Sequence, residues 1–401
     1  MGNHARTRVR RLSPEVSVVV PVTPSVPRVR TTIRRISPAV SVVVPVPVPL
    51  IVALLPAHNE AAGIAASIKA LFGQTRVPDR IIVIADACTD DTAGIAAKCG
   101  AEVFTTKPHK ALKAGALNQT MAWLLPELSD DDQVVVQDAD TTLNPAFIAS
   151  ASAALKEHSV GGACARYNSP RGFGLLGLLQ RNEFARCRRS ISRKGSTFIL
   201  VGMAAQFRVS TLREVLKLRA DGKAPPSPGL YNESSITEDY ELTICLRTLG
   251  YHLVAPPGCD PLTDVMTTVK DLWHQRIRWY RGSMDDLKRF GWTRTTTPYI
   301  GRISFWGLSS LSLIAYPVYM MYALAKYGHL TWSPLFVYMT CTFLSVMILD
   351  RCTGCRKQGP LSILFAALLF PELTYELFQS VVFWASLYKH LRKHKAEWIS
   401  N

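Results

Sequence analysis

The chain has 401 residues, which is long enough for one large domain or two smaller ones with a buried core. Its formal net charge of +16 indicates an acidic partner, such as a phosphorylated substrate, anionic lipid or nucleic acid. Because hydrophobic residues make up 48% of the chain and charged residues only 19%, the composition argues against a soluble nucleic-acid binder and favours attachment to a membrane.

The first part of the chain contains a duplication. RTRVRRLSPEVSVVVPV, residues 6–22, recurs as RTTIRRISPAVSVVVPV, residues 30–46, and each copy holds an arginine cluster, a Ser-Pro turn and a VSVVV strand candidate. Two copies are too few for a solenoid, and the prolines are typical of an extended linker. We interpret residues 1–48 as a basic, flexible arm that is either a remnant of local duplication or a contact for anionic headgroups. We expect no signal peptide.

Strand and helix patterns alternate along the next ninety residues. Apolar strands are predicted at 51–56, 80–87, 101–106 and 133–140, and helices at 60–74, 91–100 and 110–125. This alternation predicts an α/β fold with a mainly parallel sheet, in which ligands bind at the carboxyl ends of the strands. We assign residues 49–290 to this domain.

The last part of the chain, residues 291–401, is predicted to be a membrane region with two to four hydrophobic segments. Residues 303–325 carry no charge and are long enough to span a bilayer, and residues 332–349 are just long enough. Residues 361–388 are interrupted by Pro371, Glu372 and Glu376. They fit one kinked span, a re-entrant pair, or a span whose acids face other helices. The basic flanks of the first two segments predict a cytoplasmic catalytic domain.

Carboxylates follow the second and fourth predicted strands. Asp86 ends the second strand, where a carboxylate can bind a ribose or a base edge, although the following TDDT is also a good helix start. Asp138 and Asp140, two residues apart, end the fourth strand, so a small turn can direct both at one hard cation. Mg²⁺ and Mn²⁺ prefer such oxygen ligands and often bridge them to substrate phosphates.

A further pair of carboxylates, Glu238 and Asp239, stands at the start of an amphipathic helix pattern. Helix N-termini favour carboxylates, so the pair is explained either by helix-start charge or by a general base that deprotonates a sugar hydroxyl.

The stretch HQRIRWYRG, residues 274–282, concentrates arginines and aromatic rings. If residues 271–282 are helical, Gln275, Arg278, Trp279 and Gly282 share one face, which then offers an amide, a cation, a ring and a gap. The alternative is a basic amphipathic helix at a membrane surface.

Six motifs, PAHNE, ADACTDDT, KAGALN, DAD, TED and QRIRW, occur in this order. Together they resemble the family 2 inverting glycosyltransferases with the D, D, D, QxxRW signature. This group includes the cellulose, hyaluronan, chitin and poly-N-acetylglucosamine synthases and ceramide glucosyltransferase. The resemblance covers residues 51 to about 290. It implies a Rossmann-like GT-A domain followed by C-terminal transmembrane helices, a nucleotide-sugar donor that is most often UDP-linked, and Mg²⁺ or Mn²⁺.

The resemblance also implies roles for individual residues. Asp239 would be the catalytic base, with Glu238 beside it, and Asp140 would hold the metal. The implied donor-binding residues are His58, Asn59 and Glu60 after the first strand, then Asp86, Lys113 and Asp138, and finally Gln275, Arg278 and Trp279, which would hold the diphosphate and the acceptor end. One departure is that Ala85-Asp86 stands where the family often has two acids.

Three functions are compatible with the sequence. The first is a membrane-bound enzyme that adds sugars to a growing β-linked polysaccharide or oligosaccharide. The second is transfer of a single sugar to a lipid, phosphopolyprenol or protein. The third is a non-catalytic basic protein that binds membranes. A channel for a polymer needs more helices than two or three, so the first function suggests a homo-oligomer. No nucleic-acid partner is expected for either enzyme.

Overall fold

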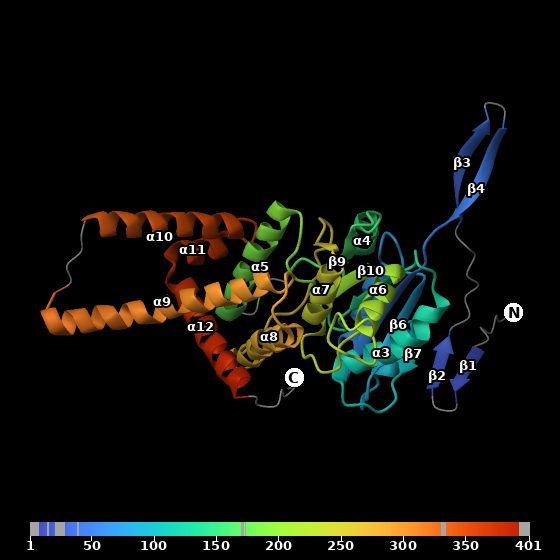
Figure 1. Ribbon diagram of the computed structural model, residues 1–401, viewed down its shortest axis with the longest axis horizontal. Helices are drawn as coiled ribbons and strands as arrows, with labels where there is room; N and C mark the ends of the chain where they lie inside the picture. Colours follow the sequence, from blue (N-terminus) through green and yellow to red (C-terminus); the bar gives the residue numbers. More distant parts are fainter. Residues whose placement is uncertain are drawn as a thin grey trace.

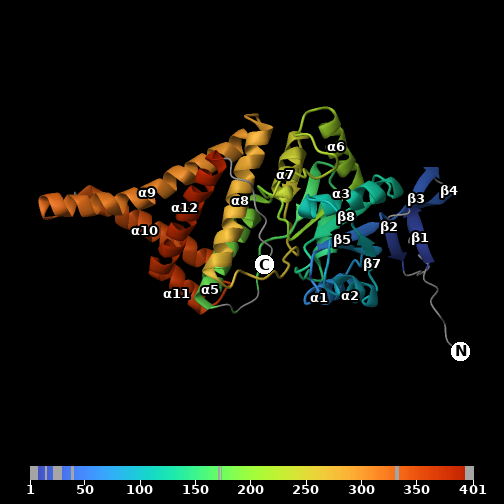
Figure 2. The ribbon, with the colours of Figure 1, turned by 90° about the horizontal axis from the view of Figure 1, so that it is seen from below.

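The computed structural model describes residues 8–13, 16–20, 29–37, 40–169, 172, 174–329 and 334–392. A nine-stranded mixed sheet with the order β1-β2-β7-β6-β5-β8-β10-β9-β11 forms its centre. Helices α1 and α2 lie on one side of this sheet and α3 and α6 on the other, as Figure 2 shows. Helices α9 to α12 form a helical tail, in which α9 and α10 extend away from the sheet while α12 lies beside α8 (Figure 1).

The strands of the central sheet are β1 (Arg8–Ser13), β2 (Val16–Val20), β5 (Ile51–Ala57), β6 (Arg80–Ala85), β7 (Glu102–Thr105), β8 (Gln133–Gln137), β9 (Val160–Cys164), β10 (Ala204–Arg208) and β11 (His252–Val254). Strands β3 (Val29–Ser37) and β4 (Val40–Pro47) pair separately. The helices are α1 (Ile64–Phe72), α2 (Thr92–Lys98), α3 (Leu112–Leu124), α4 (Phe147–Ala154), α5 (Gly174–Lys194), α6 (Val209–Ala220), α7 (Glu238–Thr248), α8 (Val269–Phe290), α9 (Thr297–Tyr327), α10 (Pro334–Cys355), α11 (Pro360–Leu368) and α12 (Phe370–Leu391).

The four apolar strands predicted from the sequence are confirmed as β5, β6, β7 and β8, and they are parallel to one another. Leu54 of β5 is aligned with Ile82 of β6 on one side and Val136 of β8 on the other. These strands are buried on both faces, which explains their continuous apolar runs. Parallel strands end at one edge of the sheet, so the loops after β5, β6 and β8 meet there.

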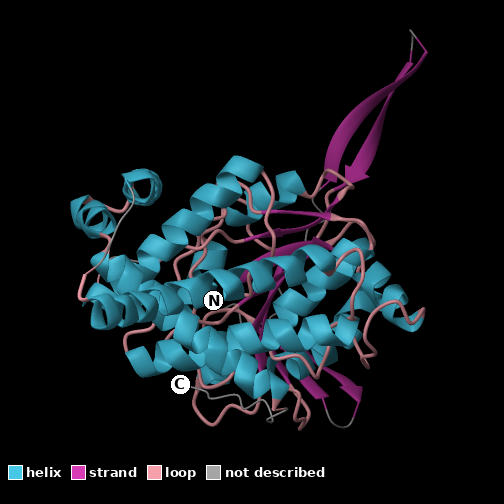
Figure 3. Ribbon diagram, turned by 60° about the vertical axis from the view of Figure 1, so that its left-hand side comes forward, coloured by secondary structure: helices cyan, strands magenta, loops and turns pink. Residues whose placement is uncertain are grey.

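Each copy of the N-terminal duplication forms a β-hairpin. The two predicted VSVVV strands are confirmed as β2 and β4, each paired in antiparallel fashion with the arginine-rich strand before it. Strand β2 also adds to the edge of the central sheet beside β7, whereas the β3–β4 hairpin projects from the molecule (Figure 3). A lipid contact of this arm stays a prediction.

The helical tail differs from the predicted spans. Within the described part of the chain, no single helix is long and apolar enough to cross a membrane, so the spans predicted at 303–325 and 332–349 are not supported there. The pair α11–α12, bent by 73°, does meet the length and composition of a broken span or a re-entrant loop. The pair matches one of the alternatives left open for residues 361–388. Glu372 is fully buried, and its carboxylate accepts hydrogen bonds from Asn182 of α5 and Arg351 of α10.

Candidate active site

The loops after β5 and β6 are joined by hydrogen bonds that involve four predicted donor-binding residues. His58 Nδ1 donates to the carbonyl oxygen of Asp86 over 2.6 Å, and Asn59 Oδ1 accepts from the backbone N–H of Thr89 over 2.7 Å. The backbone N–H of Glu60 donates to Thr92 Oγ1, which lies in the first turn of α2. His58 and Asn59 are exposed, so their remaining polar atoms stay available to a ligand.

The Asp86 side chain is held by two residues that the sequence reasoning did not single out. Thr106 Oγ1 donates to Asp86 Oδ1 over 2.8 Å, and His109 Nε2 approaches the same oxygen to 2.9 Å. Since His109 Nδ1 accepts from the backbone N–H of Ala111, the ring carries its proton on Nε2 and donates it to Asp86. Asp86 is therefore fixed in place, with one carboxylate oxygen engaged by the protein.

The KAGALN motif supplies three different parts of this site. Lys113 is an ion-pair partner, described below. A Cβ atom at Gly115 would lie 2.4 Å from His109 Nδ1, so the glycine makes room for the ring that holds Asp86. Asn118 binds both backbone polar groups of Tyr231, at 2.8 and 2.9 Å, and so fixes the segment that leads into α7.

Backbone strain gathers at the same edge of the sheet. Asn59, Ala87 and Leu112 have φ angles of 58°, 48° and 49°, in the left-handed region that non-glycine residues rarely adopt. They follow β5 and β6 and begin α3. Such strain costs about 1–3 kcal/mol per residue and persists where the surrounding structure over-determines the backbone, often at functional sites.

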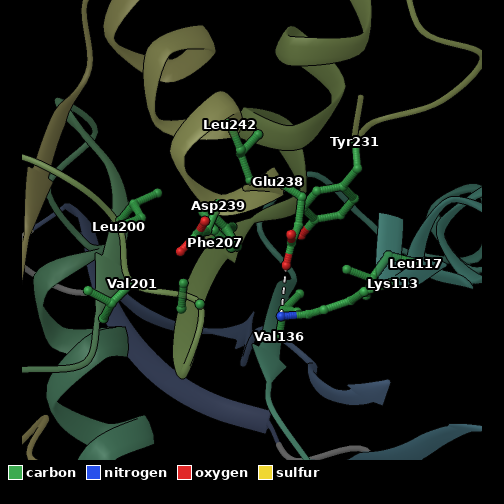
Figure 4. Close-up of a pocket in the computed structure, with 12 residues that line it drawn as sticks. Lys113, Leu117, Val136, Leu200, Val201, Phe207, Tyr231, Glu238, Asp239 and Leu242 are labelled. Atoms are coloured by element: carbon green, nitrogen blue, oxygen red, sulfur yellow. Dashed lines mark ion pairs between the residues drawn. The ribbon is translucent and has the colours of Figure 1, made fainter. Parts of the chain in front are cut away.

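Lys113 lies between two carboxylates of different motifs. Its Nζ is 2.6 Å from Asp138 Oδ1 and 2.9 Å from Glu238 Oε1, and Figure 4 shows the pair with Glu238. Burial acts to lower the pKa of Lys113, but the two carboxylates outweigh it and hold the pKa well above its usual value. Burial by itself would raise the pKa of Glu238, but the positive charge of Lys113 lowers it below its ordinary range. Both Lys113 and Glu238 are therefore charged.

Asp239 is the acidic group whose environment suits a base. Burial and the neighbouring charge of Glu238 raise its pKa from an ordinary 3.8 to about 6. A Cβ at Gly202, in the segment before β10, would lie 3.1 Å from Asp239 Oδ2, so this glycine keeps the carboxylate uncrowded. Figure 4 shows Glu238 reaching Lys113, with the Asp239 carboxylate on the side of Leu200 and Val201, in a pocket that all of these residues line.

Carboxylates outnumber cations where β8 ends. Partial loss of hydration at Asp140 and, after it, the negative charge of Asp138 raise the pKa of Asp140. Burial, Asp140 and Asp138 raise the pKa of Glu60. The described residues hold no group of three or more His, Cys, Asp or Glu side chains arranged as a complete metal site. An excess of hard oxygen ligands short of a full cage fits Mg²⁺ or Mn²⁺, which commonly completes its coordination with water and phosphate.

Helices α7 and α8 touch at the TED motif. A Cβ at Gly282 would lie 2.5 Å from Thr237 Oγ1, so the predicted gap on α8 is filled by the protein itself. Asp286 accepts hydrogen bonds from Ser235 and Thr237, both at 2.8 Å, and pairs with Arg289 at 2.6 Å. Burial raises the pKa of Asp286 to about 7. These contacts fix the start of α7, which carries Glu238 and Asp239.

The QRIRW motif lies on α8, so its predicted helix is confirmed. Arg278 is close enough to Glu238 to lower the pKa of that group, which places it at the site. Gln275 and Trp279 are half-buried on the same helix. Arg276 differs, because it is buried and stacks over the Trp279 ring, 4.3 Å from its centroid.

The structure thus brings together most of the predicted residues in two adjoining groups. The loops after β5 and β6 carry His58, Asn59 and Asp86, and the second group joins β8, α3, α7 and α8. Sequence reasoning missed His109, Thr106, Gly202, Asp286 and Arg276. Of these residues, only Arg276 was conspicuous in the sequence, as one of the clustered arginines. Its spacing along the helix did not indicate which residues it would contact.

Comparisons with known proteins agree with this geometry. Residues 133–384 match the family described as glycosyl transferase family group 2. The chain is 25% identical over 254 residues to the probable glycosyltransferase YdaM of Bacillus subtilis, covering 61% of this chain and 57% of that protein. It is 26% identical over 249 residues to the poly-beta-1,6-N-acetyl-D-glucosamine synthase of Staphylococcus aureus, covering 60% and 56%. It therefore spans little more than half the length of these relatives.

One solved structure shares the fold across most of the chain. It is the mannosyltransferase PcManGT from Pyrobaculum calidifontis in complex with GDP-Man and Mn²⁺, with a TM-score of 0.56 and 20% identity, covering 86% of this chain and 88% of that one. The mixed sheet is thus a Rossmann-like sheet of the GT-A type. The fold and the family match define an enzyme of the glycosyltransferase class. The chain belongs to glycosyltransferase family 2, as the motifs predicted.

Proposed function

We propose that this enzyme transfers a sugar, with inversion, from a nucleotide-sugar to a growing β-linked polysaccharide or oligosaccharide. The observation that carries the proposal is the position of Asp239, a half-buried carboxylate next to the Lys113–Asp138 and Lys113–Glu238 ion pairs, with a pKa raised to about 6. A base with a pKa near 6 is largely ionised at neutral pH and still accepts a proton readily.

The proposed reaction is a single displacement. Asp239 takes the proton of an acceptor hydroxyl while that oxygen bonds to the anomeric carbon of the donor sugar. The bond from this carbon to the diphosphate breaks, and its electron pair leaves with the nucleoside diphosphate. Lys113, which pairs with Asp138 and Glu238, and Arg278, which acts on the pKa of Glu238, are the cations that would favour the leaving group electrostatically. UDP is the proposed nucleotide, with Asp86 and the exposed His58 and Asn59 at its base and ribose.

Asp140 would hold a divalent cation together with the donor diphosphate, with Asp138 and Glu60 contributing negative charge nearby. Such a cation, when bound, neutralises the diphosphate as negative charge develops on it. Lys113 already engages one oxygen of Asp138, so Asp140 is the better placed ligand.

The proposal is tested with full-length protein in detergent, a panel of nucleotide sugars, and Mg²⁺ or Mn²⁺. Release of nucleotide from one donor, with a radiolabelled product ladder, is the expected result. A single-sugar adduct would move the enzyme to lipid or protein modification. Absence of release from folded protein with every donor and carbohydrate acceptor would overturn the proposed reaction.

We also propose that the helical tail holds the enzyme on the cytoplasmic face of a membrane. Large apolar side chains are exposed along it, including Phe305, Tyr319 and Met321 on α9, Tyr338, Phe343 and Leu349 on α10, and Phe370 on α12. Exposed apolar surface of this extent is typical of a contact with lipid or protein.

Flotation with phosphatidylcholine vesicles tests this attachment. The double variant Phe343→Glu and Val346→Glu, at two exposed positions of α10, should no longer float. The control variant Lys98→Glu and Lys223→Glu introduces two glutamates at exposed positions of the catalytic domain, with an even larger loss of positive charge, and should float normally. Equal flotation of both variants would rule out α10 as a lipid contact.

A further inference from the structure

Arg276 belongs to the QRIRW motif, yet its guanidinium is bound by residues from two other helices. The residue is 3% exposed, and its Nη2 donates to Glu183 Oε2 of α5 over 2.7 Å and to the Tyr375 hydroxyl of α12 over 3.3 Å. The Tyr375 hydroxyl donates to the same Glu183 oxygen over 2.8 Å, and it accepts from Gln379 Nε2 over 3.2 Å. The three groups thus form a closed triangle between α5, α8 and α12.

The same guanidinium lies 4.3 Å above the centroid of the Trp279 ring. A buried cation over an indole is attracted to the face of the ring, so the position of the guanidinium sets the plane of the ring. One face of Trp279 is therefore occupied by the protein. The opposite face and the edge are what the ring can offer to a ligand.

Helix α12 packs along α8 through several contacts besides the triangle. These contacts fix the position of Tyr375 relative to Arg276. Both views of the ribbon place the two helices side by side (Figures 1 and 2). Phe378 packs edge-on against Trp273 with ring centroids 6.1 Å apart, and Phe383 does so against Tyr280 at 5.8 Å. Near the end of α12, His390 Nδ1 lies 2.6 Å from Asp285 Oδ1 of α8.

We propose that Tyr375 and Glu183 are positioning residues for Trp279. They fix the Arg276 guanidinium, which fixes the indole plane against which the acceptor sugar packs. The identity of that ligand rests on the proposed function, whereas the coupling of Tyr375 to the Trp279 ring does not. The bent helix pair of the tail thereby controls the geometry of the acceptor side of the catalytic site.

Fluorine NMR tests the coupling without relying on activity. The full-length protein in detergent is labelled with 5-fluorotryptophan at its eight tryptophans, and the variant Trp279→Phe assigns one resonance. Tyr375→Phe keeps the ring that stacks on Phe378 but removes the hydroxyl, so the Trp279 resonance should shift or broaden. The control Tyr338→Phe, at an exposed position of α10, should leave it unchanged. A Trp279 resonance in Tyr375→Phe identical to that of the wild type overturns the proposal.

Kinetics then separate positioning from general damage. In Tyr375→Phe the acceptor KM should rise about fivefold, the loss expected for one hydrogen bond, while hydrolysis of the donor without acceptor keeps its wild-type rate. Glu183→Gln retains a hydrogen-bond acceptor and should have a smaller effect. An equal fall in hydrolysis and transfer would contradict a positioning role. Absence of turnover by the wild type would defeat the proposed function instead, and the resonance alone would decide the coupling.

Discussion

Clusters of carboxylates occur in the tail and in the candidate active site, and their charge is compensated differently in the two regions. In the tail, Glu372 is fully buried and accepts hydrogen bonds from Asn182 at 2.8 Å, Arg186 at 2.6 Å and Arg351 at 2.7 Å. Glu376 is paired with the same two arginines at 3.6 and 3.2 Å. Two acids and two bases balance within the protein.

In the active site the balance is left incomplete. Lys113 interacts with four carboxylates, those of Asp138, Asp140, Glu238 and Asp239, and Glu60 adds a fifth negative charge beside Asp138 and Asp140. Burial and, after it, the neighbouring carboxylates raise the pKa values of Glu60, Asp140 and Asp239 above their ordinary range. A structural ion pair is neutralised by its own partners, whereas this site keeps negative charge that a cation, a proton or a positively charged transition state can neutralise. We therefore expect the carboxylates of the tail to contribute to stability and those of the candidate active site to contribute to catalysis.

The substitution with the largest expected effect on activity is Asp239→Asn. It removes the proposed base while keeping the shape of the side chain, so transfer should fall about 10²- to 10⁴-fold. Donor binding, measured by calorimetry, should stay near the wild-type value. Near-normal turnover would show that Asp239 is not the base and that its raised pKa has another purpose.

In the tail the corresponding change is Glu372→Ala, which should act on stability. It leaves Arg186 and Arg351 without their buried partner and should cost about 3–5 kcal/mol of folding free energy, seen as a large fall in melting temperature. The matched control is Glu376→Ala, because that carboxylate is 31% exposed. Its removal should cost only about 0–1 kcal/mol. Equal losses would contradict the distinction between the two acids.

Gly282→Ala tests whether the active site also depends on close packing. The added Cβ would lie 2.5 Å from Thr237 Oγ1 and 3.0 Å from Ile236 Cγ1, so the start of α7 must move and carry Asp239 with it. We expect kcat to fall about 10- to 100-fold. Gly301→Ala is the control, since nothing lies within 4 Å of its Cβ. A fully active Gly282→Ala enzyme would show that α7 adapts to the change.

The smallest predicted effect concerns pH. Asp239 acts only when deprotonated, so with a pKa raised to about 6 its transfer activity should be present above pH 6 and lost as the pH falls through that value. In Lys113→Met the remaining carboxylates lose a positive neighbour that lowers the pKa of Asp239, so this acid limb should move to higher pH. A pH–rate profile of kcat/KM checks both statements. An unchanged limb in Lys113→Met would show that the lysine does not tune the base.

Much of the catalytic domain was predictable because its signals are local. The strands β5, β6 and β8 are buried on both faces, so each is a continuous apolar run that the sequence displays directly. Asp86 and Asp138 follow such runs, and their place at the edge of the sheet follows from parallel pairing alone. The start of α7 was equally readable from its acidic first turn.

The supports of these residues were not predictable. The distance from His109 to Asp86 is 23 residues along the chain, and that from Glu183 to Arg276 is 93. No local pattern pairs them, because each contact depends on how two elements pack. The partners of Glu372 were not predictable for a related reason, since the arginines that pair with this buried acid come from two other helices, α5 and α10.

The sequence by itself determined the family, the order of strands and helices in the first half of the domain, and the acids at the strand ends, because these depend on periodicity and short spacing. Tertiary structure decided which carboxylates pair with Lys113. It also decided that Arg276 stacks on Trp279 and that α12 lies along α8. Those features arise from the burial of charges and rings contributed by distant segments. Their energies exist only once the segments meet.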